Sequence, residues 1–168
     1  GVRNCALGFE ALESNATGGS NTAMGYQALY SNTGDGNSGF GNDALRLNTS
    51  GEKNTALGNE ALENNTTASF NTAVGHEALT ANTTGSQNTA VGAYVLDANT
   101  TGVRNTAVGE QALQANTTGQ HNTCIGFASL YNQTTGEFNT AIGYYALLNN
   151  TTANNNTAVG YNSLLENT

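Results

Sequence analysis

The residues that could do chemistry in this chain are few and scattered. The two histidines, His76 and His121, lie far apart in the sequence, and neither has a cysteine or a cluster of carboxylates beside it. Zinc sites need three or four such ligands, so the histidines predict no metal site. No Ser-His-Asp set is recognisable either. We therefore expect neither enzymatic activity nor a cofactor.

Acidic residues offer one weak alternative. The run SGFGNDALR, residues 38–46, nearly matches a calcium-binding nonapeptide, but it occurs once, and such a site needs neighbouring copies. Asp43, Glu60 and Glu77 recur at the same place in successive repeats and should form a column. Stacked like charges repel each other, so we interpret this column as solvated, with cation binding as the alternative.

The two cysteines also lack a mutual partner. Cys5 and Cys124 lie seven repeats apart, which corresponds to roughly 33 Å at the spacing of stacked strands. A disulfide cannot span that distance within one chain. They are interpreted as small residues that fit the repeat, with an interchain link as the alternative.

All of these residues belong to a repeat that fills the chain. When each copy is numbered from the Asn of its NTAVG-like block, position one is Asn, position five is Gly and position nine is Leu in all ten copies. Copies begin 17 residues apart, except for one step of 16 between Asn21 and Asn37. We expect residues 1–168 to be a single uncapped array that continues as a longer array or filament.

Composition limits the class of function. The chain of 168 residues has a formal charge of −8 and only 4 Lys and Arg residues. Nucleic-acid binding depends on neutralising phosphates, so this balance disfavours it. No apolar run is long enough to span a membrane, and we expect no membrane insertion.

The repeat length favours an all-β fold. A unit of 17 residues is too short for paired helices but suits one rung of a parallel β-solenoid, or β-roll, of ten rungs. Thr-Ala-Val is typical of a strand, and Asn-Thr-Thr-Gly is typical of a turn. We expect two short strands and two turns per rung, although Ala-Leu at positions eight and nine fits either a second strand or one helical turn.

Stacking should place each residue on its own copy. We expect Asn at positions one and twelve to form amide ladders, with simple turn formation as the alternative at position twelve. Leu at position nine and the large apolar residue at position four should supply two large core side chains per rung. Adjacent strand residues point to opposite faces, so apolar residues should also line an outer face that a partner chain covers.

The repeat resembles known fibre proteins. The stretch NTAVGHEALTANTTGSQNTAVG, residues 71–92, resembles repeat regions of phage tail-fibre and bacterial surface-fibre proteins. Its NTAVG block is also similar to the shorter repeat of trimeric autotransporter adhesin heads. That resemblance implies a left-handed roll, three chains side by side, and a place on a cell surface, in the extracellular space or on a virion fibre.

We therefore expect a structural or adhesive extracellular fibre segment that self-associates as a homotrimer or an end-to-end filament. Ice binding is an alternative, because Thr recurs at position two. Carbohydrate binding is another, in which surface glycans contact ligand-facing aromatic residues at position six. These aromatic residues are Phe9, Tyr26, Phe127, Tyr144 and Tyr161, and they could instead cover apolar surface between chains.

Four Asn-Thr-Thr sequences match the N-glycosylation acceptor pattern. They begin at Asn82, Asn99, Asn116 and Asn150. Glycans on all four would decorate one edge of the rod at close spacing. Turn formation is the alternative role for these asparagines.

Overall fold

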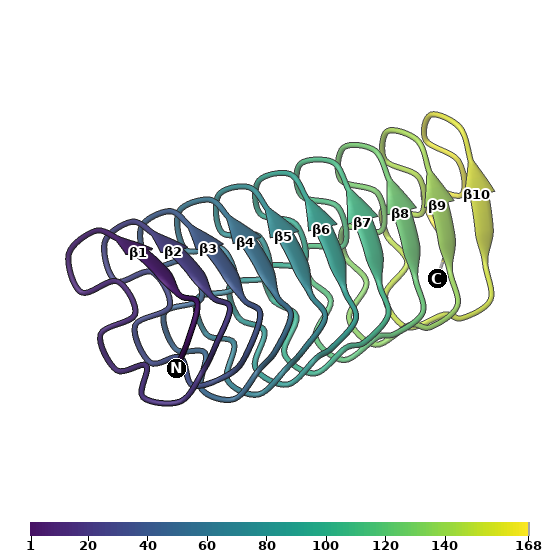
Figure 1. The fold of residues 1–168 in the computed structure, drawn as a ribbon. Coiled ribbons are helices and arrows are strands. Elements are labelled where there is room, and N and C mark those ends of the chain that lie inside the picture. Colours follow the sequence, from purple (N-terminus) through teal and green to yellow (C-terminus); the bar gives the residue numbers. More distant parts are fainter. Residues whose placement is uncertain (168) are drawn as a thin grey trace.

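The computed structural model describes residues 1–167. Each repeat contributes one strand of three residues to a rod with the two termini at opposite ends (Figure 1). The strands are β1 (Cys5–Leu7), β2 (Thr22–Met24), β3 (Ser38–Phe40), β4 (Thr55–Leu57), β5 (Thr72–Val74), β6 (Thr89–Val91), β7 (Thr106–Val108), β8 (Thr123–Ile125), β9 (Thr140–Ile142) and β10 (Thr157–Val159).

The ten strands form one parallel sheet in sequence order. Equivalent repeat positions pair with each other, as in Thr72 with Thr89 and Val74 with Val91. The 16-residue copy keeps this register, because Thr22 pairs with Ser38. The prediction of a parallel β-solenoid with repeats of about 17 residues is confirmed. The strands turn gradually along the rod, from an inclined β1 to a nearly upright β10 (Figure 1).

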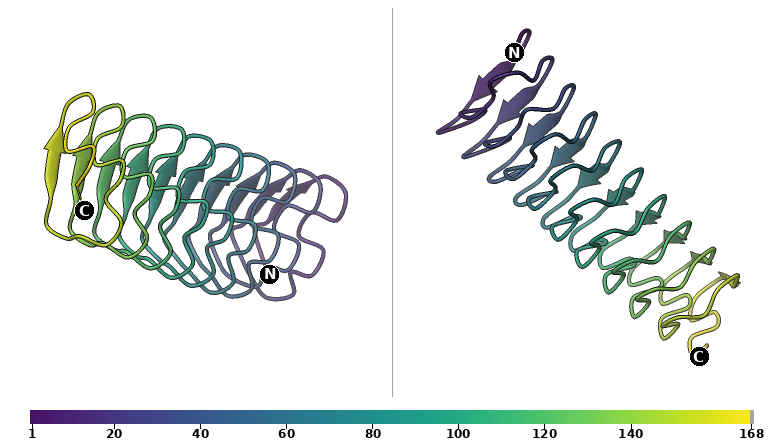
Figure 2. Two further views of the ribbon diagram at one scale, coloured as in Figure 1. Left: turned by 180° about the vertical axis from the view of Figure 1, so that it is seen from behind. Right: turned by 90° about the horizontal axis from the view of Figure 1, so that it is seen from below.

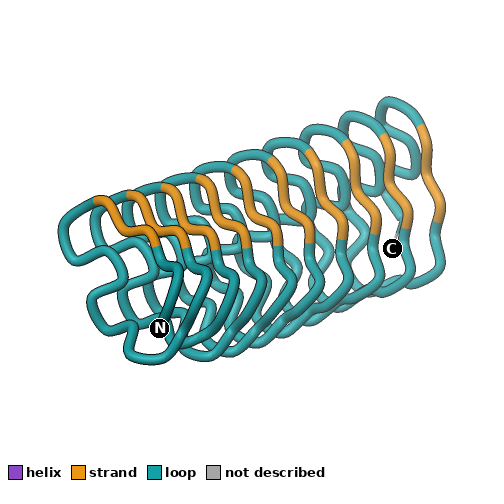
Figure 3. The backbone as a smooth tube through the Cα atoms, viewed as in Figure 1, coloured by secondary structure: helices purple, strands orange, loops and turns teal. Residues whose placement is uncertain are grey.

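One part of the prediction is wrong, because a rung has one strand rather than two. The rest of each rung consists of turns and bends without regular secondary structure (Figures 2 and 3). The Ala-Leu segment is therefore neither a second strand nor a helical turn. Within residues 1–167, the structure contains no helix that could cross a membrane.

The interior holds one large side chain per rung. Leu at position nine is fully buried from Leu29 to Leu147, together with the small residues at positions three and eight. The expectation that position four also belongs to the core is wrong. Leu57 at that position is 49% exposed, whereas its neighbour Ala56 is buried. The narrow cross-section accepts Leu from one wall and only a small residue, Gly, Ala or Cys, from the other.

Backbone conformation explains why Ala and Leu can both point inward. Residues at positions seven and nine have positive φ, such as Glu77 at 53° and Leu79 at 56°. In a strand, neighbouring side chains point to opposite faces. The positive φ values at positions seven and nine break this pattern, so Ala78 and Leu79 are both buried. The backbone N–H of Leu79 donates to the carbonyl of Val95 in the next rung, at 3.0 Å.

Two buried columns of asparagine join successive rungs. At position twelve, Nδ2 of Asn82 donates to Oδ1 of Asn65 in the previous rung and to the carbonyl of Gly85 in its own turn, each at 2.9 Å. At position one, Oδ1 of Asn71 accepts the backbone N–H of Asn88. The amide ladder is thus confirmed at position twelve, whereas the position-one column is joined mainly by bonds from the backbone N–H of one copy to Oδ1 of the copy before it. They satisfy polar groups that burial would otherwise leave unpaired.

Candidate binding surfaces

The outer face of the sheet is the most regular surface of the molecule. Because position three points inward, positions two and four of every strand point outward. Position two contributes Cys5, Thr22, Ser38, Thr55, Thr72, Thr89, Thr106, Thr123, Thr140 and Thr157. Position four contributes Leu7, Met24, Phe40, Leu57, Val74, Val91, Val108, Ile125, Ile142 and Val159. We call these two columns the sheet face.

The sheet face is uncharged, its position-four column is apolar, and its side chains are exposed or half-buried. None of its side chains is ionisable apart from the thiol of Cys5. Met24, Leu57 and Ile125 each leave more than two fifths of their surface open to solvent. A continuous apolar strip of this length is unusual on a monomeric protein and is typical of an interaction surface.

The aromatic residues of position six lie beside this face in two separate stacks. Phe9 packs on Tyr26 with ring centroids 5.5 Å apart and planes within 9°. Tyr144 stacks between Phe127 and Tyr161, at centroid distances of 5.2 and 5.4 Å. The structure therefore groups the five predicted aromatic residues as two and three. The ring of Tyr144 is covered on both faces, whereas each ring at the end of a stack is covered on one face only.

A shallow depression lies next to the second stack, at residues that sequence reasoning missed. It has a volume of about 320 Å³. Its lining residues are Gln111, Ala128, Tyr131, Asn132, Tyr145 and Leu148. The signal in the sequence was the small Ala128 at position seven, between Gln111 and Tyr145 of the adjacent copies. Only the fold shows that positions seven, ten and eleven border one hollow.

The four asparagines of the glycosylation pattern lie inside the rod. Asn82, Asn99, Asn116 and Asn150 have no exposed surface. Each Nδ2 donates both to the previous rung and to its own turn, as for Asn99 to Asn82 at 2.8 Å and to Gly102 at 3.1 Å. A glycan on Nδ2 would displace one of these bonds and would have no space. The geometry thus favours the alternative role, in turns and ladders.

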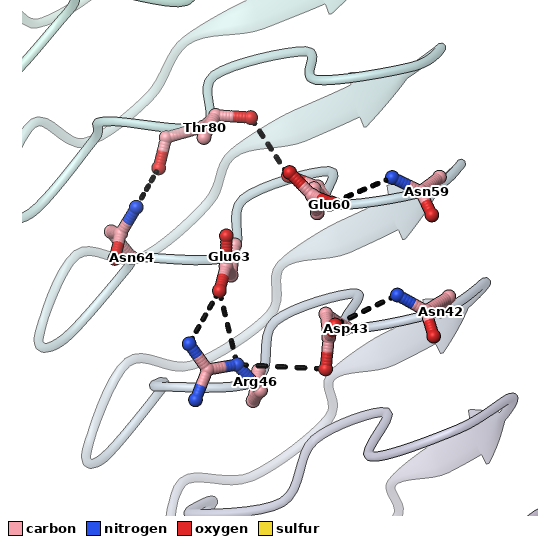
Figure 4. A network of polar contacts seen from close by, with 8 residues as sticks. All are labelled: Asn42, Asp43, Arg46, Asn59, Glu60, Glu63, Asn64 and Thr80. Atoms are coloured by element: carbon pink, nitrogen blue, oxygen red, sulfur yellow. Dashed lines mark hydrogen bonds and ion pairs between the residues drawn. The ribbon is translucent and has the colours of Figure 1, made fainter.

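The members of the acidic column have different partners, and only Asp43 is paired with an arginine. Nε of Arg46 lies 3.5 Å from Asp43 Oδ1, and the same guanidinium pairs with Glu63 of the next rung (Figure 4). The hydrogen bond that Arg46 donates to Glu63 raises the pKa of Arg46 above its ordinary value, against the opposing effect of burial. Asn59 donates to Glu60, also in Figure 4.

Histidines and cysteines build no metal centre in the described part of the chain. His76 lies 3.0 Å from Glu77, whereas His121 stacks on Phe138 and contacts Arg104. Residues 38–46 follow the ordinary rung, with β3 at their start. Across residues 1–167, no three of the His, Cys, Asp and Glu residues come together as metal ligands.

The cysteines differ in access. Cys5 is exposed on β1, whereas Cys124 points into the core in place of Ala, and both thiols are free. Burial raises the pKa of Cys124 far above its ordinary value, so the thiol stays protonated and inert in the folded rod.

The surfaces of this chain must be interpreted from their own geometry. Comparisons with protein-family models, with curated proteins and with solved structures gave no match.

Proposed function

We propose that this chain is a structural segment of an extracellular fibre, in which copies associate through the sheet face. The observation that carries the proposal is the uncharged apolar column at position four, which is exposed or half-buried in every strand from Leu7 to Val159. Burying it against a partner would contribute about 25 cal/mol for each Å² of apolar surface removed from water.

A second copy of the same chain is the partner that fits this surface best. The sheet face repeats its two columns at the strand spacing of about 4.8 Å. Another copy carries the same period, so its side chains can fit between rungs along the whole length of the rod. Closed symmetric pairing of this kind joins identical patches. A pair of rods uses this contact, whereas the three-chain bundle implied by the adhesin resemblance would turn the sheet face of each chain toward a common axis.

The proposed location and adhesive role rest on the repeat resemblance. A rod of stacked rungs can act as a spacer, and the exposed aromatic stacks supply contact points at two places along it. We place the segment on a cell surface or virion fibre. The core and ladder residues would then maintain the shape of the rod, with no catalytic role for any side chain.

Molar mass in solution tests the association. The triple variant Val74→Glu, Val91→Glu and Val108→Glu puts three charges on the sheet face. Thr84→Glu, Thr101→Glu and Thr118→Glu form the matched control, because these threonines are exposed in the same three rungs. We expect light scattering to give an oligomer for the wild type and the control, and a monomer for the valine variant. A monomeric wild type at high concentration would refute the proposal.

Ice binding is the second candidate function, and one specific observation favours it. The Thr and apolar columns point outward together, so hydroxyl and methyl groups alternate across a surface without charge. The gradual turning of the strands in Figure 1 argues against it, because a crystal plane is flat. Measured thermal hysteresis that the valine variant abolishes would support this function over self-association, and the absence of hysteresis would remove it.

A further inference from the structure

The depression beside Tyr145 exists because one repeat departs from its neighbours. Position seven carries a side chain longer than Cβ in every other copy, but in the eighth copy it is Ala128. Ala128 is only 2% exposed and forms the floor. Gln111 of the preceding rung and Tyr145 of the following rung stand on either side of it. The missing side chain therefore opens a gap one rung wide.

Aromatic and aliphatic groups border this gap. Tyr131 and Leu148, both at position ten, form the second wall. Tyr145 is held by tilted contacts with Tyr144 and Phe127, at centroid distances of 4.2 and 5.6 Å. Position seven of the preceding rung is Ala128, so no ring from position seven packs on Tyr145 from that side. At position six, by contrast, rings of successive rungs stack on each other. Tyr145 is thus a braced ring that borders open space.

Two neutral amides at the rim have free hydrogen-bonding capacity. Asn132 donates Nδ2 to Oδ1 of Asn149 at 2.8 Å, which leaves its own Oδ1 as an acceptor. Within residues 1–167, the Gln111 side chain takes part in no hydrogen bond, although its backbone N–H is bonded to Ala93. Its amide therefore offers both a donor and an acceptor. No charged residue lines the depression.

We propose that this depression binds one neutral pyranose sugar unit. A pyranose has a face of C–H groups that packs on an aromatic ring and an edge of hydroxyls that bond to amides, and the depression supplies both. Its volume of about 320 Å³ falls at the lower end of the range for ligand pockets, about 300–1,000 Å³. The chain's charge of −8 and the uncharged lining disfavour anionic sugars.

This site moves the carbohydrate hypothesis away from position six. There, the rings of Phe127, Tyr144 and Tyr161 cover one another. At position seven, the single alanine breaks the column, and the half-buried ring of Tyr145 borders the depression that results. The sugar site and the sheet face involve different residues, so each proposal can fail without the other.

Saturation-transfer NMR on the full chain tests the site. The probes are the methyl glycosides of glucose, galactose, mannose and N-acetylglucosamine, with N-acetylneuraminic acid as the anionic comparison. We expect transfer to at least one neutral glycoside and none to the acid. Ala128→Gln fills the gap with a residue that position seven already holds at Gln27 and Gln111, with the same positive φ. It should weaken binding at least tenfold.

The remaining variants separate binding from folding. Tyr145→Ala should also weaken binding at least tenfold, whereas Tyr94→Ala, in the same column but outside the depression, should leave it unchanged. Melting temperatures establish that each variant is folded. If neither the wild type nor the monomeric valine variant binds any of the four glycosides, the proposal is wrong. Equal binding by Ala128→Gln and the wild type would also overturn it.

Discussion

Leucine recurs at position nine because of its backbone as well as its volume. The ten leucines have φ between 51° and 57°, in the left-handed region. Positions seven and seventeen share this conformation, and none of the residues there is Val, Ile or Thr. Branching at Cβ crowds the backbone at positive φ, so β-branched residues are strained in this region. Leu fills the core without that strain.

The shape of the side chain should therefore matter more than its volume at position nine. We expect Leu96→Ile to lower the free energy of unfolding by about 2 kcal/mol, because the isomer keeps the volume but adds strain. Leu96→Met, which is unbranched at Cβ, should cost less than about 1.5 kcal/mol. Urea denaturation of both variants measures the difference. Equal losses would show that φ does not restrict this position.

Within residues 1–167, the amide ladder at position twelve is interrupted at two steps, between Asn15 and Asn32 and between Asn116 and Gln133. Gln133 stands at position twelve, where every other copy has Asn. Its longer side chain donates to Gly136 and accepts from Asn139 and Asn150, but it does not donate to the rung before it. Oδ1 of Asn116 is consequently buried without a hydrogen-bond partner. An unpaired buried acceptor costs about 1–3 kcal/mol.

Restoring the repeat residue should repair this defect. We expect Gln133→Asn to raise the free energy of unfolding by about 1 kcal/mol, because the new Nδ2 can donate to Asn116. Asn99→Gln introduces the same interruption in an intact rung and should destabilise by a similar amount. Urea midpoints of the two variants provide the measurement. A stabilisation by both changes would contradict the role of the ladder.

At the scale of the elements, the sequence predicted how the rungs stack better than it predicted which side chains of a rung point inward. The invariant Asn, Gly and Leu established the period, the register and the two Asn columns. Periodicity could not decide which of the apolar neighbours Ala73 and Val74 points inward. That choice depends on the width left by Leu79 on the opposite wall, which is a property of the closed rung. The depression over Ala128 was also missed, because only the closed rung shows which positions border it.

The bend after each strand requires glycine. The glycines at position five have φ between 125° and 148°, which side chains rarely allow. A Cβ on Gly75 would lie 2.2 Å from the carbonyl oxygen of Gly92 in the next rung. Neither rung can withdraw without breaking the parallel pairing of β5 and β6.

Substitution at this bend should therefore disrupt the stack. We expect Gly75→Ala to destabilise the chain by about 3 kcal/mol or more, because a backbone atom has to move. Gly36→Asn is the control, since Asn155 occupies the equivalent position at φ 60° and the nearest atom to a Cβ on Gly36 is 3.6 Å away. It should change stability by less than about 0.5 kcal/mol. Thermal melting distinguishes the two.

For the whole molecule, the buried thiol of Cys124 should make the free energy of unfolding depend on pH. The folded thiol keeps its proton, whereas an unfolded thiol titrates near pH 8.5. Above that pH the folded state binds more protons than the unfolded state, so stability falls as pH rises. We expect this loss, measured by urea midpoints from pH 7 to 10, to be smaller in Cys124→Ala. Parallel curves would contradict it.

The amide ladder at position twelve aligns side-chain dipoles along the axis of the rod. Backbone hydrogen bonds between rungs run both ways, from Cys5 to the following rung and from Gly25 to the preceding one, so their dipoles largely cancel. Wherever a position-twelve side chain bonds to the same position of another rung, it donates backwards, as Asn65 does to Asn48 and Asn82 to Asn65. Their dipoles add with every rung, and aligned amides polarise one another. An array of these repeats should therefore carry a permanent dipole along its axis that grows with its length, and such a rod would orient in an applied electric field.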